Sequence, residues 1–175
     1  MKELYAYPVL EDAFKNCILG DFSKEYVFDE LGLVLEVGPL NILKTLSIKI
    51  TSSMALELTD GRYLICIAKE DILAAPKEMQ LMMLNFIFYH EVGHIVNGDQ
   101  WDTNPDSNLI QEKKADEYSV KILDLSSDEA CQMIECVYQR ISNNLDAAEK
   151  TEQTKTRIEI LTKARLARME YIKTL

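Results

Sequence analysis

A short string in the middle of the chain has the residue types and spacing of a metal site. It reads His90-Glu91-Val92-Gly93-His94. Residues four apart lie on one face of a helix, so both imidazoles can reach the same ion. Glu91 is one step around the helix, where its carboxylate can contact a water on the metal without binding the metal. Because zinc lowers the pKa of such a water to ~7, the string predicts hydrolytic chemistry with Glu91 as the general base.

Two observations favour a metal site over a chance spacing on a surface helix. The chain of 175 residues has only two histidines, and both lie in this string. The residues before it are apolar on every side of the predicted helix, as at Leu84, Phe86 and Ile87, which indicates a buried helix. Two unpaired imidazoles would be costly in such a place, so the setting favours metal ligands.

A third ligand is available on the next predicted helix. The string E-K-K-A-D occupies residues 112–116. Its Glu112 would complete a set of two nitrogens and one oxygen, which leaves the fourth position of Zn²⁺ open. Asp116 shares a helix face with Glu112 and can accept a hydrogen bond from a histidine, fixing its tautomer. The small residues Ala115 and Gly93 permit the two helices to approach closely.

The two strings together resemble the gluzincin metallopeptidases. The nearest patterns are those of the HtpX-like and CAAX-prenyl-type peptidases, with H-E-x-x-H and E-x-x-A-D. The ImmA/IrrE-type peptidases, which cleave or inactivate repressors, are similar too but usually carry Asn at the position of Asp116. The resemblance covers about residues 62–125. It implies zinc ligation by the two histidines and Glu112, base catalysis by Glu91 and support of a histidine by Asp116.

The chain also departs from related zinc peptidases. Metzincins need a third histidine six residues after the second, and that position is Gln100. Without a third histidine, a tyrosine or arginine must stabilise the oxyanion. The candidates are Tyr118 and Arg157, with Tyr89 and Tyr138 as alternatives. The HtpX-like enzymes are embedded in membranes, whereas the most apolar stretch here, residues 79–89, is too short to span one.

The segments before the string predict a small sheet. The predicted elements are helices at residues 9–19 and 23–31 and strands at residues 46–50, 54–58 and 62–68. The Asp60-Gly61 step between the last two strands is a strong hairpin signal, because both central positions of that turn favour positive φ. The strand at residues 62–68 directly precedes the predicted helix that carries His90 and His94. We expect it to be the sheet edge, and the resemblance implies that substrate lies along this edge.

The rest of the chain predicts helices. Pro76 can open the metal helix and Gly98 can end it, while Ser126 with Glu129 forms a capping box for a later helix. The predicted helices cover residues 77–97, 108–124, 126–141 and 146–173. The expected fold is α+β, with a small antiparallel sheet and a hairpin edge strand packed on a central H-E-x-x-H helix. A mostly helical C-terminal half follows, and residues 1–175 are expected to form a single zincin-like metallopeptidase domain.

Composition limits the classes of partner and compartment. A net charge of −10 and a pI near 4.7 argue against nucleic-acid binding. Four cysteines occur without a C-x-x-C pair, which is typical of reduced thiols in a cytoplasmic protein: Cys17, Cys66, Cys131 and Cys136. No secretory signal is expected at the N-terminus, because residues 1–10 lack a long apolar stretch, and no membrane span is expected.

These observations predict a soluble, cytoplasmic zinc endopeptidase that acts on a protein or peptide substrate. One alternative is a regulatory peptidase with a narrow target, such as a transcriptional repressor. A second is a binding protein that keeps the metal scaffold without catalysis, although Glu91 would then have no use. A third is a non-haem iron protein, because iron also binds two histidines and one carboxylate.

Overall fold

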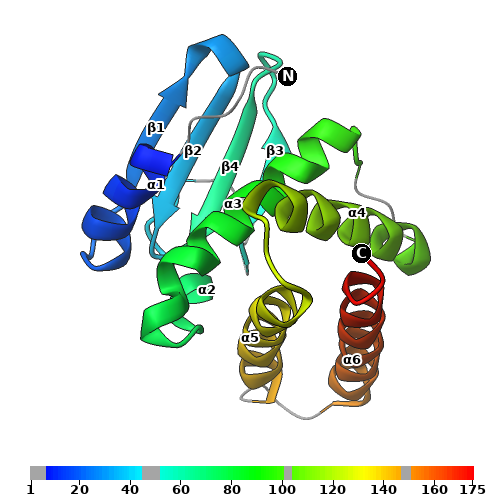
Figure 1. Cartoon of the computed structure of the whole chain (residues 1–175). Coiled ribbons are helices and arrows are strands. Elements are labelled where there is room, and N and C mark those ends of the chain that lie inside the picture. Colours follow the sequence, from blue (N-terminus) through cyan, green and yellow to red (C-terminus); the bar gives the residue numbers. More distant parts are fainter. Residues whose placement is uncertain (1–6, 45–51, 101–103, 147–150) are drawn as a thin grey trace.

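The computed structural model describes residues 7–44, 52–100, 104–146 and 151–175. A four-stranded sheet occupies the N-terminal half, and long helices fill the C-terminal half (Figure 1). The first half contains α1 (Tyr7–Ala13), a π-helical turn (Phe14–Ile18), β1 (Lys24–Phe28), a 3-10 turn (Asp29–Leu31), β2 (Leu33–Gly38), β3 (Met54–Glu57), β4 (Tyr63–Ala68) and α2 (Lys69–Leu73). The second half contains a 3-10 turn (Lys77–Met79), α3 (Gln80–Asn97), α4 (Pro105–Leu123), α5 (Ser127–Asp146) and α6 (Glu152–Ile172). The predicted α+β class and helical C-terminal half are confirmed.

The sheet is mixed, whereas an antiparallel sheet was expected. Its strand order is β1-β2-β4-β3. The outer pairs, β1 with β2 and β3 with β4, are antiparallel, but β2 and β4 are parallel, with Leu33 opposite Tyr63. The strand predicted as the edge, residues 62–68, is therefore in mid-sheet, and that prediction is wrong. Within the described residues, the hairpin strand at the sheet edge is β3, because the second strand of the hairpin, β4, lies between β3 and β2.

The predicted hairpin is present, although its turn differs from the expected one. The backbone N–H of Leu58 donates to the carbonyl of Arg62 at 2.7 Å, and the N–H of Gly61 donates to the carbonyl of Leu58 at 3.0 Å. Gly61 has a φ of +82°, but Asp60 is not among the positive-φ residues of the described chain. This is the three-residue loop that ends in a left-handed glycine, rather than a two-residue turn.

In the N-terminal third, the observed elements differ most from those that the sequence predicts. Residues 23–31 form β1 and a 3-10 turn instead of the predicted helix. The reversal is made by Gly32, whose φ of +60° suits a glycine. Strand β2 was not predicted because every residue in it is buried, so it lacks the alternation of a half-exposed strand. The predicted strand at residues 46–50 lies outside the described residues.

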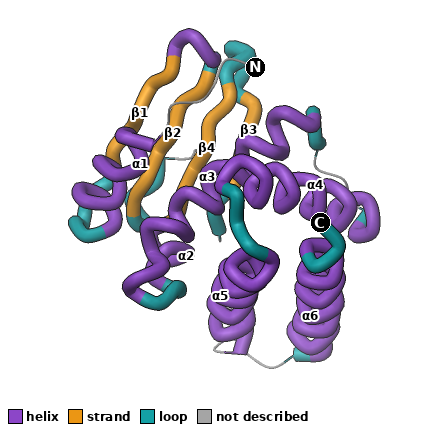
Figure 2. The backbone as a smooth tube through the Cα atoms, in the orientation of Figure 1, coloured by secondary structure: helices purple, strands orange, loops and turns teal. Residues whose placement is uncertain are grey.

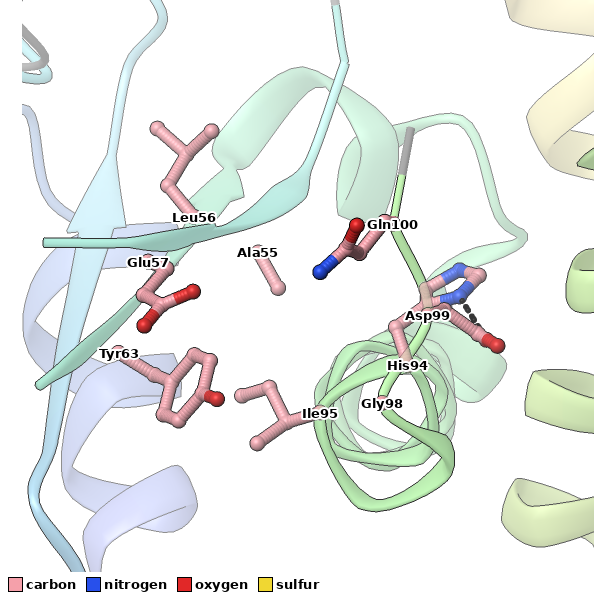
Figure 3. A pocket seen from close by; sticks show the side chains of 9 residues that line it. All are labelled: Ala55, Leu56, Glu57, Tyr63, His94, Ile95, Gly98, Asp99 and Gln100. Atoms are coloured by element: carbon pink, nitrogen blue, oxygen red, sulfur yellow. Dashed lines mark hydrogen bonds and ion pairs between the residues drawn. The ribbon is translucent and has the colours of Figure 1, made fainter. Parts of the chain in front are cut away.

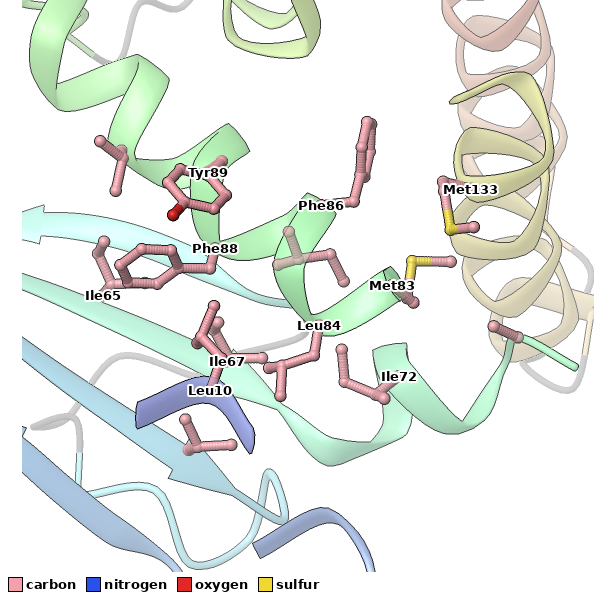
Figure 4. Close-up of a cluster of buried hydrophobic side chains, with 14 of the residues drawn as sticks. Leu10, Ile65, Ile67, Ile72, Met83, Leu84, Phe86, Phe88, Tyr89 and Met133 are labelled. Carbon is pink, nitrogen blue, oxygen red and sulfur yellow. The ribbon is translucent and has the colours of Figure 1, made fainter. Parts of the chain in front are cut away.

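Helix α3 crosses one face of the sheet and forms the centre of the core. Phe88 and Leu84 of α3 pack with Ile65 and Ile67 of β4 and with Leu10 of α1, all of them essentially inaccessible (Figure 4). The helix is buried continuously over residues 83–93, as its apolar character predicted. The core has the sheet on one side of α3 and helices on the other. Because such a core is close-packed, it fixes the positions of residues 90–94.

The three C-terminal helices form a layer in which α4 contacts α3 and α6 contacts both α4 and α5. Helix α4 packs along α3, and α5 and α6 lie side by side below it (Figure 2). The expected cap of α5 is present, since the N–H of Glu129 donates to Ser126 Oγ and the N–H of Ser126 donates to the Glu129 carboxylate. Helix α6 runs toward α4 and packs against it, so the C-terminal end of the chain lies next to α4 (Figure 1).

The close approach of α3 and α4 at Gly93 gives the first prediction. A Cβ at Gly93 would lie 3.0 Å from the Ala115 Cα and 3.1 Å from the Tyr118 Cβ. In an unconstrained helix, Gly→Ala stabilises by ~1 kcal/mol. We expect Gly93→Ala to destabilise instead, because overpacking costs ~1–3 kcal/mol and the backbone of α4 must move. Thermal unfolding followed by circular dichroism measures this, and a midpoint equal to or above that of the wild type would contradict the close approach.

Candidate metal centre

Helices α3 and α4 bring three metal-ligand side chains together. One ligand atom from each of His90, His94 and Glu112 lies within 4.8 Å of the others. The Nε2 atoms of the two histidines are 3.1 Å apart, and the Glu112 oxygens lie 3.3 Å from His90 Nε2 and 3.6 Å from His94 Nε2. Ligands of tetrahedral zinc with bonds of ~2.0–2.1 Å stand roughly 3.3 Å apart. The group can hold a metal ion.

Both imidazoles are turned toward this centre by carboxylates behind them. His90 Nδ1 is 2.9 Å from Asp116 Oδ1, and His94 Nδ1 is 2.9 Å from Asp99 Oδ2. An ionised carboxylate accepts the Nδ1 proton, and this tautomer leaves the Nε2 lone pair facing the centre. Two such lone pairs repel each other at 3.1 Å, so the space between them has to hold a proton or a cation. The donor set therefore fits a metal.

Asp99 is a functional candidate that the sequence analysis missed. It follows Gly98, which has a φ of +66° and ends α3 as expected. The backbone N–H of Asp99 donates to the carbonyl of His94 at 3.0 Å. This reversal of the chain carries the Asp99 side chain back beside the His94 ring, where only 11% of it is exposed. The signal was present as an aspartate immediately after a helix-ending glycine.

Arg168 of α6 is the second missed residue, and it completes the centre from the far end of the chain. Its Nε and Nη2 donate to the two oxygens of Asp116 at 2.7 and 2.6 Å, and its Nη1 lies 3.0 Å from Glu112 Oε2. The guanidinium is buried, and it also contacts the hydroxyl of Tyr138. Such a two-point contact with a carboxylate fixes both position and orientation. No local spacing could reveal it, because α4 and α6 are far apart in sequence.

The charged residues of this group shift one another's pKa values toward the charged forms. Burial opposes the charged form of Glu112, but Arg168 and the two histidines outweigh burial and hold the pKa of Glu112 well below its ordinary value. The pKa of Asp116 is lowered against burial in the same way, chiefly by Arg168. Burial would lower the pKa of His90, yet contacts with Asp116 and Glu112 raise it to about 10. Both carboxylates are therefore ionised at neutral pH, as ligand and acceptor roles require.

Glu91 lies beside the ligand group but outside it. Only 6% of the residue is exposed, on α3 between the two histidines. Burial raises the pKa of its carboxyl to about 7, since the opposing charge of His90 offsets only part of that effect. A carboxyl that titrates near neutrality can both accept and return a proton under ordinary conditions.

Two clefts open on either side of Glu91. One, of about 380 Å³, lies among α3, α4, α5 and α6. The other, of about 430 Å³, runs beside the edge strand β3. Four residues line both clefts: Ser52, Ser53, Glu91 and Glu112. Figure 3 shows a smaller pocket of about 140 Å³ that continues along β3, with Asp99 and His94 on one side and Tyr63 on the other. The ligand group therefore borders open space on both sides.

The structure does not bring the two favoured oxyanion candidates to these clefts. Tyr118 is partly buried on α4, and Arg157 is exposed near the start of α6. Neither is among the described residues that line the clefts beside Glu91. Of the alternatives, Tyr138 does line the cleft among the helices, together with Arg168.

Comparison with known proteins adds no relative. No protein-family model, no curated protein and no solved structure matches the chain. Within the part of the chain that the structure describes, no helix is long and apolar enough to cross a membrane. The resemblance to gluzincins thus rests on the two strings alone, and the structure adds that His90, His94 and Glu112 lie close enough to hold a metal ion.

The carboxylate behind His94 gives the second prediction. We expect Asp99→Asn to weaken zinc binding ~10–100-fold, because loss of such an outer partner frees the ring and lowers its basicity. Zinc affinity is measured by competition with a chromogenic chelator. Asp106→Asn, the same change at an exposed position of α4, is the matched control and should leave the affinity unchanged. Equal zinc affinities in the two variants would contradict the role of Asp99 as the hydrogen-bond acceptor behind His94.

The buried ion pair gives the third prediction. Arg168→Leu should lower the free energy of unfolding by ~3–5 kcal/mol, because it leaves the Asp116 carboxylate buried without its cation. Denaturant unfolding of the metal-free protein measures the loss. Arg165→Leu, one turn earlier on the same helix, removes a contact of Arg165 with Glu135 that is more open to solvent, and it should cost much less. Similar losses in both variants would contradict a central role for Arg168.

Proposed function

We propose that this chain is a zinc-dependent endopeptidase that hydrolyses a peptide bond of a protein substrate. The observation that carries the proposal is Glu91, a buried carboxyl that stands beside the ligand group and opens on two clefts. When bound, zinc supplies a Lewis acid and lowers the pKa of a coordinated water. Glu91 is the group that accepts the proton of the attacking water and returns it to the leaving amine.

The edge strand supports binding of an extended peptide. Among the residues that the structure describes, strand β3 pairs with β4 on one side only, and its residues Met54, Ala55 and Leu56 line the cleft that contains Glu91. An extended chain can add to such an edge through main-chain hydrogen bonds. The backbone of Ala55 also acts to lower the pKa of the Glu91 carboxyl, so the edge strand lies beside this residue. We therefore propose for β3 the substrate-binding role that we expected of the strand at residues 62–68.

The alternatives explain less of the geometry. A metal scaffold without catalysis could use Asp99 and Asp116 to orient the histidines, but it needs no base such as Glu91, whose burial costs free energy. A regulatory peptidase with a narrow target uses the same chemistry and is a special case of the proposal. An iron centre would use the same three ligands. The H-E-x-x-H spacing on a helix is the feature that favours zinc.

The fourth prediction tests the base. Glu91→Gln should keep the fold and the zinc but slow peptide hydrolysis by ~10²–10⁴-fold or more, because an amide has similar shape and cannot accept the proton. Zinc content and cleavage of a peptide mixture are measured on the same preparation. Glu112→Gln is the companion variant, and it should lose zinc as well because it removes a charged ligand. Full turnover by zinc-loaded Glu91→Gln would overturn the proposed function.

A further inference from the structure

The cleft among the four helices differs in character from the groove beside β3. Apolar side chains from α3, α4, α5 and α6 form its walls: Phe86, Ile87, Leu109, Val137, Ile141 and Leu161. His90, Glu91 and Glu112 also line it. We propose that this apolar cleft is a specificity pocket for a bulky apolar side chain, aromatic or branched aliphatic, of a residue next to the scissile bond. The proposal rests on the proposed function and names its substrate class.

The charged residues inside the apolar cleft already have partners. Arg168 is paired with Asp116 and Glu112, and the carboxylate of Asp71 accepts hydrogen bonds from the backbone N–H and the hydroxyl of Ser53 and pairs with Arg140. An acidic substrate side chain would enter without a free cation to pair with and would lose its hydration. An apolar side chain has no such cost, and its transfer from water is favourable. The pairing of Arg168 and Arg140 therefore selects against negative charge, and the walls select for apolar surface.

The groove on the other side of Glu91 offers a different environment. It is lined by the β3 segment Met54 to Leu56 and by the polar side chains of Asp99, Gln100 and Gln111. A peptide that lies along β3 thus places one flank of the scissile bond on main-chain and polar groups and the other flank toward the helices. The preference for a bulky apolar residue should consequently appear at one of the two positions that flank the cleaved bond, and not at both.

The volume of the apolar cleft fits this assignment. At about 380 Å³ it is at the lower end of ligand pockets in proteins, which measure ~300–1,000 Å³, and it has room for an aromatic ring. Ala164 of α6 is the smallest side chain in its wall and is partly buried. Replacement of this methyl group by a larger side chain fills the cleft from the side of α6 and changes none of the three ligand residues.

The first arm of the test measures binding without catalysis. Three hydroxamates that anchor on zinc and differ in their side group are titrated calorimetrically into the zinc-loaded protein: acetohydroxamate, phenylpropanohydroxamate and succinohydroxamate. We expect the phenyl compound to bind ~10–100-fold more tightly than the other two, from burial of the ring. Ala164→Phe should abolish that ratio. Ala167→Phe, the same change one turn later at a position outside the cleft, should preserve it.

The second arm measures cleavage. A mixture of internally quenched peptides, randomised around the centre, is incubated with the zinc-loaded wild type, and the cleaved bonds are read by mass spectrometry. We expect enrichment of large apolar residues at one flanking position, and a shift to small residues in Ala164→Phe. Indifference to the side group, in the hydroxamates or in the cleaved bonds, would overturn the pocket while the peptidase stands. Discrimination among the hydroxamates without cleavage of any peptide would support the pocket and count against the proposed peptidase.

Discussion

The candidate centre depends on one buried carboxylate. Asp116 has no accessible surface, and it contacts the His90 ring on one side and the Arg168 guanidinium on the other. A carboxylate can be buried only where charge and hydrogen bonds compensate for its lost hydration. Through Asp116, helix α4 is therefore tied to α3 and to α6 at the same point. The orientation of the first histidine and the position of the C-terminal helix follow from that one requirement.

The balance of charge around the ligands favours a divalent cation. The carboxylates of Glu91, Asp99, Glu112 and Asp116 surround the two imidazoles. Arg168 pairs with Glu112 and Asp116, and the same two carboxylates raise the pKa of His90. Negative charge is thus in excess where the three ligand atoms meet. Arg168 holds one oxygen of Glu112 at 3.0 Å, which leaves the other oxygen, 3.6 Å from His94 Nε2, free to turn toward a metal. The same guanidinium forms part of the wall of the apolar cleft.

The residues that sequence reasoning found share a local pattern. The two histidines, Glu112 and Asp116 were predictable because helical spacing fixes which side chains share a face. Asp99 was missed although an aspartate after a helix-ending glycine was visible in the sequence, because its place beside His94 depends on the chain reversal after α3. Arg168 could not be predicted, because its contacts depend on how α6 packs. The sheet was predicted only in part, because β2 is buried on both faces and shows no alternation. The true edge strand could not be distinguished from β4, because a hairpin signal does not say which of its strands finds a second neighbour.

The most direct test of this account is the zinc stoichiometry of the chain. Metal-free protein is titrated with zinc against a chromogenic chelator, in parallel for the wild type and His94→Ala. The account predicts uptake of about one zinc ion per chain by the wild type, and a loss of most of that affinity in the variant, because one of three protein ligands is gone. No uptake by the wild type, or equal uptake by the two proteins, would contradict the assignment of His90, His94 and Glu112 as a metal centre.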